Sequence, residues 1–286
     1  MISFITEPFS IWNHTAAPEQ GNREKEVFLC VNSSDWKLKT AVICGSRKAF
    51  FSWQHLVFVT LICLAAILLG VLLGKRNRGR SDREKNHALI AAALLIDALE
   101  LFEIVFLCFR SHNPLNWLTN LPLFLCSVQA IALPMAAFCK GRLQLAARDF
   151  VSVFGVLGML LGTYGAGQNY ASYPVLSFNN VQSGLIHCIS GFAAIYIFAA
   201  GMASLQKRDM WITYSILAGL CVIAYVANVL IGYNYMFLMR GDGTPYDLVY
   251  NAVGGSPVLY PLCVVGMFLL YIALFYRVVY LLRRKP

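Results

Sequence analysis

Seven apolar stretches of about 16 to 25 residues follow one another through the chain, and they constrain its fold more than any other feature. The hydrocarbon core of a bilayer is about 30 Å thick, so a helix needs about 20 apolar residues to cross it. The sequence therefore predicts an all-α polytopic membrane protein, a bundle of seven transmembrane helices. The expected spans are residues 53–74, 87–109, 115–138, 149–164, 181–204, 210–233 and 258–282.

The composition agrees with a membrane protein and leaves little room for anything else. Of the 286 residues, 58% are hydrophobic and 13% are charged, and the mean hydropathy is +0.62. Ordinary soluble domains carry about 25% charged residues. Because seven spans and their loops use most of the chain, any activity must lie within the bundle or at one of its ends.

The positions of the basic residues predict the orientation of the bundle. The net charge of +9 could indicate nucleic-acid binding, but Lys and Arg fall between apolar spans rather than on one continuous face. Cytoplasmic loops of membrane proteins carry an excess of Lys and Arg. Here the first, third and fifth loops and the C-terminus are basic, whereas the alternate loops carry only Arg110 and Arg240. This alternation predicts an N-terminus outside and a C-terminus inside.

Residues 1–50 form a polar segment that we expect outside the membrane, ahead of a transmembrane domain of residues 51–286. The segment lacks the apolar core of a cleaved signal peptide. It contains Cys30, Cys44 and two N-x-[ST] triplets, at Asn13 and Asn32. Two short strands could bring Cys30 and Cys44 together as a disulfide on an oxidising side. The alternative is a tail with two unrelated thiols.

The remaining seven cysteines lie in or beside apolar spans, and no C-x-x-C pair occurs anywhere. This pattern does not predict a structural zinc site, and neither a metal nor another cofactor is expected. Two long loops on the outer side, residues 165–180 and 239–256, are rich in Gly, Pro, Asn and Tyr. We expect these loops to be ordered and to cover the outer end of the bundle.

Cys126 lies in the middle of the third predicted span, followed by Ser127 and Gln129. Polar side chains inside the hydrocarbon zone are costly unless they face the protein interior, so they indicate function by default. In a helix Ser127 and Gln129 would lie 100° and 300° around from Cys126, so the three cannot all face one pocket. We therefore expect Cys126 alone to point into a site.

The second span carries three carboxylic acids at three-residue spacing, Asp97, Glu100 and Glu103. On a helix this spacing spreads them over about 120° of one face, which must point into the bundle. A carboxyl group there can serve packing alone, by hydrogen bonding across the bundle. That interpretation is favoured for Asp97, whereas Glu100 and Glu103 are candidates for a functional pocket.

His187, in the fifth span, is expected at the depth of Cys126, roughly 9 to 16 Å below the outer surface at 1.5 Å per residue. Glu100, Glu103 and Asn228 come out at a similar depth, with Asn234 nearer the surface. A lone histidine in a membrane helix is more often a hydrogen-bonding residue than a catalyst. A thiol within reach of an imidazole, with a third group orienting that imidazole, is nevertheless what covalent acyl chemistry needs.

Several short motifs in this order resemble the YwaF-like family of integral membrane proteins, over residues 50–282. They are residues 51–55, with Phe51, Ser52 and His55, residues 121–127 (LPLFLCS), residues 179–182 (NNVQ) with His187, residues 228–236, and Pro257 with residues 260–261. A vertebrate branch of that family is regarded as a phospholipid acyltransferase with an intramembrane cysteine and histidine. The resemblance implies Cys126 as nucleophile, His187 as its base, membrane lipids as partners, and a plasma membrane location as in bacterial members.

Two other classes of function compete with acyl transfer. In a transporter, Asp97, Glu100, Glu103 and His187 would form a proton or cation path and Cys126 would only pack. An odd number of spans and no inverted repeat argue against this class. A retinal-binding receptor is excluded, because the last span has no lysine to form a Schiff base.

Overall fold

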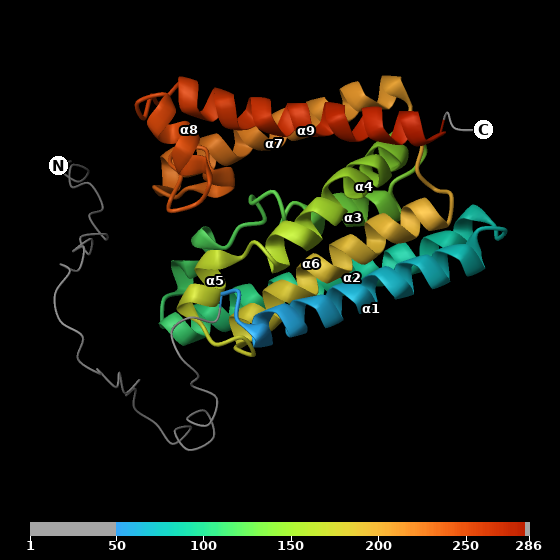
Figure 1. The fold of residues 1–286 in the computed structure, drawn as a ribbon, viewed down its shortest axis with the longest axis horizontal. Coiled ribbons are helices and arrows are strands. Elements are labelled where there is room, and N and C mark those ends of the chain that lie inside the picture. The colour runs from blue at the N-terminus through green and yellow to red at the C-terminus, as the bar shows by residue number, and fades with distance from the viewer. Residues whose placement is uncertain (1–49, 284–286) are drawn as a thin grey trace, which may run out of the picture. The chain divides into compact units, whose positions relative to one another are not determined.

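The computed structural model describes residues 50–283, so the predicted strands, the Cys30–Cys44 disulfide and both N-x-[ST] triplets lie outside the described residues. Within 50–283 every regular element is a helix (Figure 1). The elements are α1 (Trp53–Asn77), α2 (Asp82–Ser111), the 3₁₀ helix η2 (Pro114–Thr119), α3 (Gln129–Phe138), α4 (Gly141–Thr163), α5 (Gly167–Ser172), α6 (Phe178–Ala199), α7 (Lys207–Ile231), the 3₁₀ helix η3 (Tyr235–Phe237), α8 (Tyr246–Ala252) and α9 (Leu259–Arg283).

Five of the predicted spans correspond to helices that are long and apolar enough to cross a membrane, namely α1, α4, α6, α7 and α9. The second predicted span is a single helix, α2, of 30 residues. Its start is fixed by a capping box, in which Ser81 and Glu84 satisfy each other's backbone N–H groups. The structure therefore confirms an all-α polytopic membrane protein.

The third predicted span is not one helix, and here the expectation from hydropathy is wrong. A 3₁₀ helix opens it, residues 120–128 form bends and turns, and only Gln129–Phe138 is α-helical. Pro122 lies at the start of the irregular stretch, where it cannot donate a backbone hydrogen bond and disfavours a helical conformation in the residue before it. Cys126 consequently lies in a turn just before α3 rather than in the middle of a helix.

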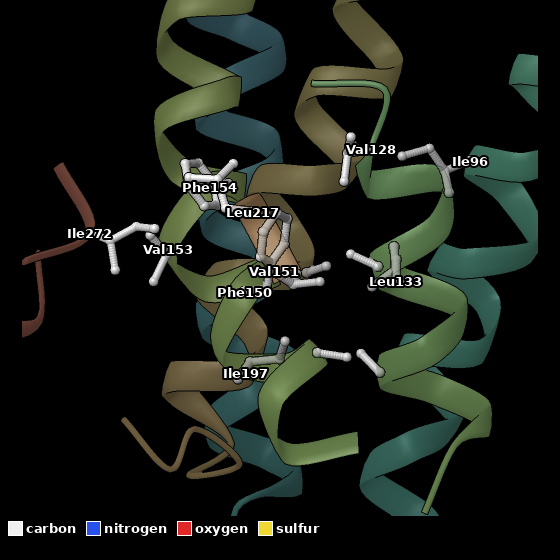
Figure 2. Close-up of a cluster of buried hydrophobic side chains, with 14 of the residues drawn as sticks. Ile96, Val128, Leu133, Phe150, Val151, Val153, Phe154, Ile197, Leu217 and Ile272 are labelled. Atoms are coloured by element: carbon white, nitrogen blue, oxygen red, sulfur yellow. The ribbon is translucent and has the colours of Figure 1, made fainter. Parts of the chain in front are cut away.

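The core is centred on α4 and α6, the most buried of the long helices. Figure 2 shows α4 at the centre of this core, with Leu133 of α3 on one side and Ile272 of α9 on the other. Glycine lets the helices approach closely: a Cβ added at Gly155 of α4 would lie 2.5 Å from the Ser190 carbonyl oxygen of α6. This close approach fixes the position of α6, which carries His187.

Buried polar contacts tie the connections to the core. The Asp149 carboxylate of α4 accepts hydrogen bonds from the backbone N–H groups of Ser204 and Leu205, at 3.0 and 2.9 Å, in the link between α6 and α7. The helices α7 and α9 pack against each other, with α8 against α9 (Figure 1). They contact the other helices mainly through α4, where the Tyr271 hydroxyl donates to the Val153 carbonyl oxygen.

Candidate functional site

A cavity of about 230 Å³ lies between α2, the segment that precedes α3, and α6. Its lining is unusually polar for the interior of a membrane protein and contains two carboxylic acids but no lysine or arginine. The side chains that carry chemistry there are Glu100, Glu103, Cys126, Ser127, Ser183 and His187. Together with Asn120, Asn169, Asn179 and Tyr233, residues from five separate parts of the sequence therefore meet at one cavity.

Cys126 lines the cavity from the turn ahead of α3. Its carbonyl oxygen accepts a hydrogen bond from the Gln129 N–H at 3.2 Å, and the Val128 N–H donates to the Phe124 carbonyl oxygen at 2.9 Å. These bonds fix the turn, so the thiol is presented by a defined backbone rather than by a free loop. Cys126 is half-buried and forms no disulfide with the described cysteines.

Ser127 lines the same cavity, although helical spacing predicted that it would point elsewhere. That prediction is wrong because the turn does not follow the 100° rotation of a helix. The Ser127 side chain lies near the Glu100 carboxyl group and the Cys126 thiol at the cavity. Pro122 in the sequence was the signal that helical spacing does not apply here.

His187 is 8% exposed and reaches the cavity from α6. Its ring lies against α4 at Gly162: a Cβ added there would be 2.1 Å from Cε1 and 2.2 Å from Nε2. Among residues 50–283 no hydrogen bond joins the His187 ring to Cys126 or to another side chain. The imidazole and the thiol therefore share the cavity without a hydrogen bond between them.

The two glutamates differ in how they are held. The Gln182 side-chain amide of α6 donates to Glu103 Oε2 at 2.7 Å and to the Leu99 carbonyl oxygen at 3.3 Å, which joins α2 to α6 beside the cavity. Glu100 is turned toward Ser127. Asp97 does not line the cavity, and its buried Oδ1 has no hydrogen-bond partner among the described residues.

Asn228 and Asn234 do not line the cavity. Each of them instead holds a nearby backbone segment of the same chain by hydrogen bonds. The Asn228 amide donates to the Tyr235 carbonyl oxygen at 3.0 Å and accepts from the Tyr235 N–H. The Tyr235 hydroxyl in turn donates to the Leu118 carbonyl oxygen and accepts from the Leu121 N–H. Asn228 thus supports the segment that leads to Cys126 through Tyr235.

Asn234 stabilises the loop after α7. Its amide donates to the Arg240 carbonyl oxygen at 2.8 Å and to Asp242 Oδ2 at 2.7 Å, and its oxygen accepts from the Met239 N–H at 2.9 Å. Of the two outer loops expected to cover the bundle, residues 165–180 contribute Asn169 and Asn179 to the cavity. The loop of residues 239–256 contributes none.

Within the part of the chain that the structure describes, no three His, Cys, Asp or Glu side chains gather closely enough to hold a metal ion. The cavity offers a nucleophile, an imidazole, carboxylic acids and amide donors in one space of about 230 Å³. This set of groups can carry acid, base and nucleophilic chemistry without a cofactor.

These observations define a polytopic α-helical membrane protein with a polar cavity enclosed by its helices. A family model, that of the TMEM164 family, matches residues 50–279. The chain belongs to the TMEM164 family. The matched residues nearly coincide with those over which the sequence resembles YwaF-like proteins. No curated protein and no solved structure matches the chain.

Proposed function

We propose that this protein transfers an acyl chain between membrane lipids through a thioester on Cys126. The observation that carries the proposal is the cavity, which a thiol and an imidazole 61 positions apart in the sequence both line. A lipid substrate suits a site enclosed by membrane helices, because its acyl chain can reach the site from the surrounding bilayer. The lining has no Lys or Arg that would bind a phosphate tightly, so recognition of the ester region is favoured over recognition of a phosphate.

The first half of the reaction forms the thioester. The Cys126 thiol gives its proton to His187 and its sulfur attacks the carbonyl carbon of the donor ester. The carbon–sulfur bond forms, the carbon–oxygen bond breaks, and the lyso-lipid leaves with the proton held by His187. In the second half the acceptor hydroxyl gives its proton to His187 and its oxygen attacks the thioester, which releases the Cys126 thiol.

The lack of a direct bond between Cys126 and His187 is compatible with this sequence of steps. Catalytic hydrogen bonds are often long or absent in unliganded enzymes and form when the substrate binds. The Ser127 hydroxyl and the Glu100 carboxyl group act as supporting groups, because they lie beside the thiol. Asn228 supports the same segment through Tyr235.

The proposal is tested with purified protein in vesicles that contain a phospholipid labelled in its acyl chain and an unlabelled lyso-lipid acceptor. Cys126→Ser and His187→Ala should each lower acyl transfer by about a hundredfold or more. Cys263→Ser and His87→Ala are matched controls, because both residues are exposed and distant from the cavity lining in the sequence. If transfer survives both cavity substitutions, the covalent mechanism is wrong.

The same protein preparation separates acyl transfer from transport. A proton or cation path through Glu100, Glu103 and His187 would give an ion flux that Glu103→Gln abolishes. Such a flux, in protein that transfers no acyl chain, would replace the proposed function with transport.

We further propose that α2 and the segment from η2 to α3 also cross the membrane, which gives seven crossings with the N-terminus outside and the C-terminus inside. The support is the alternation of basic loops and the short connections, which make successive helices run in opposite directions. Residues 1–50 would then form an extracytoplasmic segment ahead of a transmembrane domain of residues 51–286. The cavity would lie in the outer half of the bundle.

A further inference from the structure

Two cysteines that the proposed reaction does not use lie on different helices, Cys63 on α1 and Cys188 on α6. Both are free thiols, 4% and 6% exposed, and they belong to one buried cluster with Ala66 and Met159. Cys188 directly follows His187 in the sequence, so its side chain leaves α6 about 100° around from the imidazole. A second thiol site thus lies next to the cavity residue His187 but outside the cavity.

Hydrogen bonds to α4 fix the direction of the Cys63 thiol. The Thr163 hydroxyl of α4 donates to the Met159 carbonyl oxygen at 2.6 Å, and this bond uses its single proton. The Cys63 sulfur lies 3.5 Å from the same hydroxyl oxygen, so the Cys63 S–H must be the donor of that contact. The Cys63 sulfur keeps its acceptor capacity on the side of Cys188, its neighbour in the same buried cluster.

The packing of α1 against α6 follows a constant difference in residue number. Gly70 of α1 meets Ile195 of α6 and Gly74 meets Ala199: an added Cβ would lie 3.1 and 2.4 Å from their respective Cβ atoms. The residue numbers differ by 125 in both pairs, and they differ by 125 for Cys63 and Cys188 too. Cys63 and Cys188 lie seven residues, or about two helical turns, before Gly70 and Ile195 respectively. They therefore lie on the same sides of α1 and α6 that face each other at the glycine positions.

A disulfide needs Cβ atoms about 3.5–4.5 Å apart, with the side chains directed toward each other. Cys63 and Cys188 lie on the side of α1 and α6 along which the two backbones approach closely, and they share one buried cluster. We propose that Cys63 and Cys188 are an oxidisable pair that closes to a disulfide between α1 and α6. This inference does not depend on acyl transfer, because it uses neither Cys126 nor the cavity.

Hydrogen peroxide, a small oxidant that can enter a membrane protein, supplies the oxidising equivalents. One cysteine sulfur attacks a peroxide oxygen, the oxygen–oxygen bond breaks, and a sulfenic acid and one water result. The second sulfur then attacks the sulfenic sulfur, the sulfur–sulfur bond forms, and the hydroxyl leaves as a second water. The two thiol protons end in the two waters, so the pair is oxidised by two electrons and the peroxide is reduced by two. The closed bond would fix α6 at the residue next to His187.

The experiment treats the full-length protein in vesicles with hydrogen peroxide, alkylates the remaining thiols after denaturation, and maps the cysteines by mass spectrometry after proteolysis. We expect a linked peptide that joins Cys63 to Cys188, lighter by two hydrogen atoms than the two separate peptides and lost on reduction. Full alkylation of both cysteines after oxidation, or their linkage to other cysteines, would overturn the proposal.

Three variants sharpen the result. Cys63→Ser and Cys188→Ser should each abolish the linked peptide and leave the other thiol open to alkylation. Cys221→Ser is the matched control, since Cys221 is also buried but contacts Met236 of η3, and it should leave the linkage unchanged. Cys126→Ser should leave it unchanged as well. The wild-type map decides the question even if a variant fails to fold.

Discussion

At the scale of single residues, the arrangement of the cavity depends on a glycine as much as on the polar side chains that line it. Gly162 of α4 has no side chain at the point where the His187 ring lies, and the ring occupies that space. Any larger residue at this position must push the imidazole away or shift the helix. The orientation of His187 is therefore set by α4 as well as by its own helix.

Gly162→Ala tests this dependence. Alanine is favoured over glycine within a helix by about 1 kcal/mol, which offsets part of the steric cost. We expect the rate of acyl transfer to fall by up to about a hundredfold, because His187 is displaced. The thermal stability should change little. Gly219→Ala on α7 is the control, because an added Cβ there meets open space: it should leave acyl transfer unchanged and stability equal or slightly higher. An unchanged rate of acyl transfer in Gly162→Ala would show that the position of the His187 ring does not matter for the reaction.

The residue types of the site could be predicted from the sequence, but not all of their neighbours. Cys126, His187, Glu100 and Glu103 stood out because polar groups are rare in apolar spans, and all four line one cavity. Ser127 was excluded by helical geometry, which does not hold in a turn. Asn228 was expected at the depth of the site but acts one step away, through Tyr235.

At the scale of helices, the connection between α6 and α7 is held by a buried charge. Asp149 is fully buried, and both of its carboxylate oxygens accept a backbone N–H from this connection. Hydropathy predicted the two helices but carried no information on this link, since a single aspartate at the start of an apolar span indicates only its boundary. Hydrogen bonds to a charged acceptor stabilise more than neutral ones.

Asp149→Asn should weaken the connection. An amide retains one acceptor oxygen and presents an N–H₂ group to the second backbone N–H, so one buried donor loses its partner. We expect a loss of about 1–3 kcal/mol in the free energy of unfolding, measured by thermal or denaturant unfolding in detergent. Asp82→Asn is the control, because the Asp82 side chain is 88% exposed. Equal stability of the two variants would show that the buried carboxylate is dispensable.

The helix boundaries illustrate what hydropathy can and cannot predict. It located α1, α7 and α9 within a few residues, because their faces are apolar nearly all round. It failed for residues 115–138, where the side chains are apolar but proline at position 122 interrupts the backbone. Hydropathy reflects how favourably side chains transfer from water into lipid. The path of the backbone depends on its hydrogen bonds, about which hydropathy carries no information.

At the scale of the whole molecule, the topology of seven crossings that we propose makes a simple prediction. Gly79→Cys lies in the basic connection between α1 and α2, and Asn251→Cys lies in α8, between α7 and α9. In a Cys263→Ser background, a membrane-impermeant maleimide should label these two cysteines from opposite sides of sealed vesicles, Asn251→Cys from the outside. Labelling of both positions from the same side would contradict seven crossings.

The distribution of the cavity residues along the chain bears on biosynthesis. Every residue that lines the cavity precedes position 188, with the single exception of Tyr233. A nascent chain that has emerged from the ribosome as far as α6 already carries the thiol, the imidazole and both glutamates. The hairpin of α7 and α9 docks afterwards, mainly on α4. Assembly of the cavity can thus begin before synthesis of the last two long helices is complete.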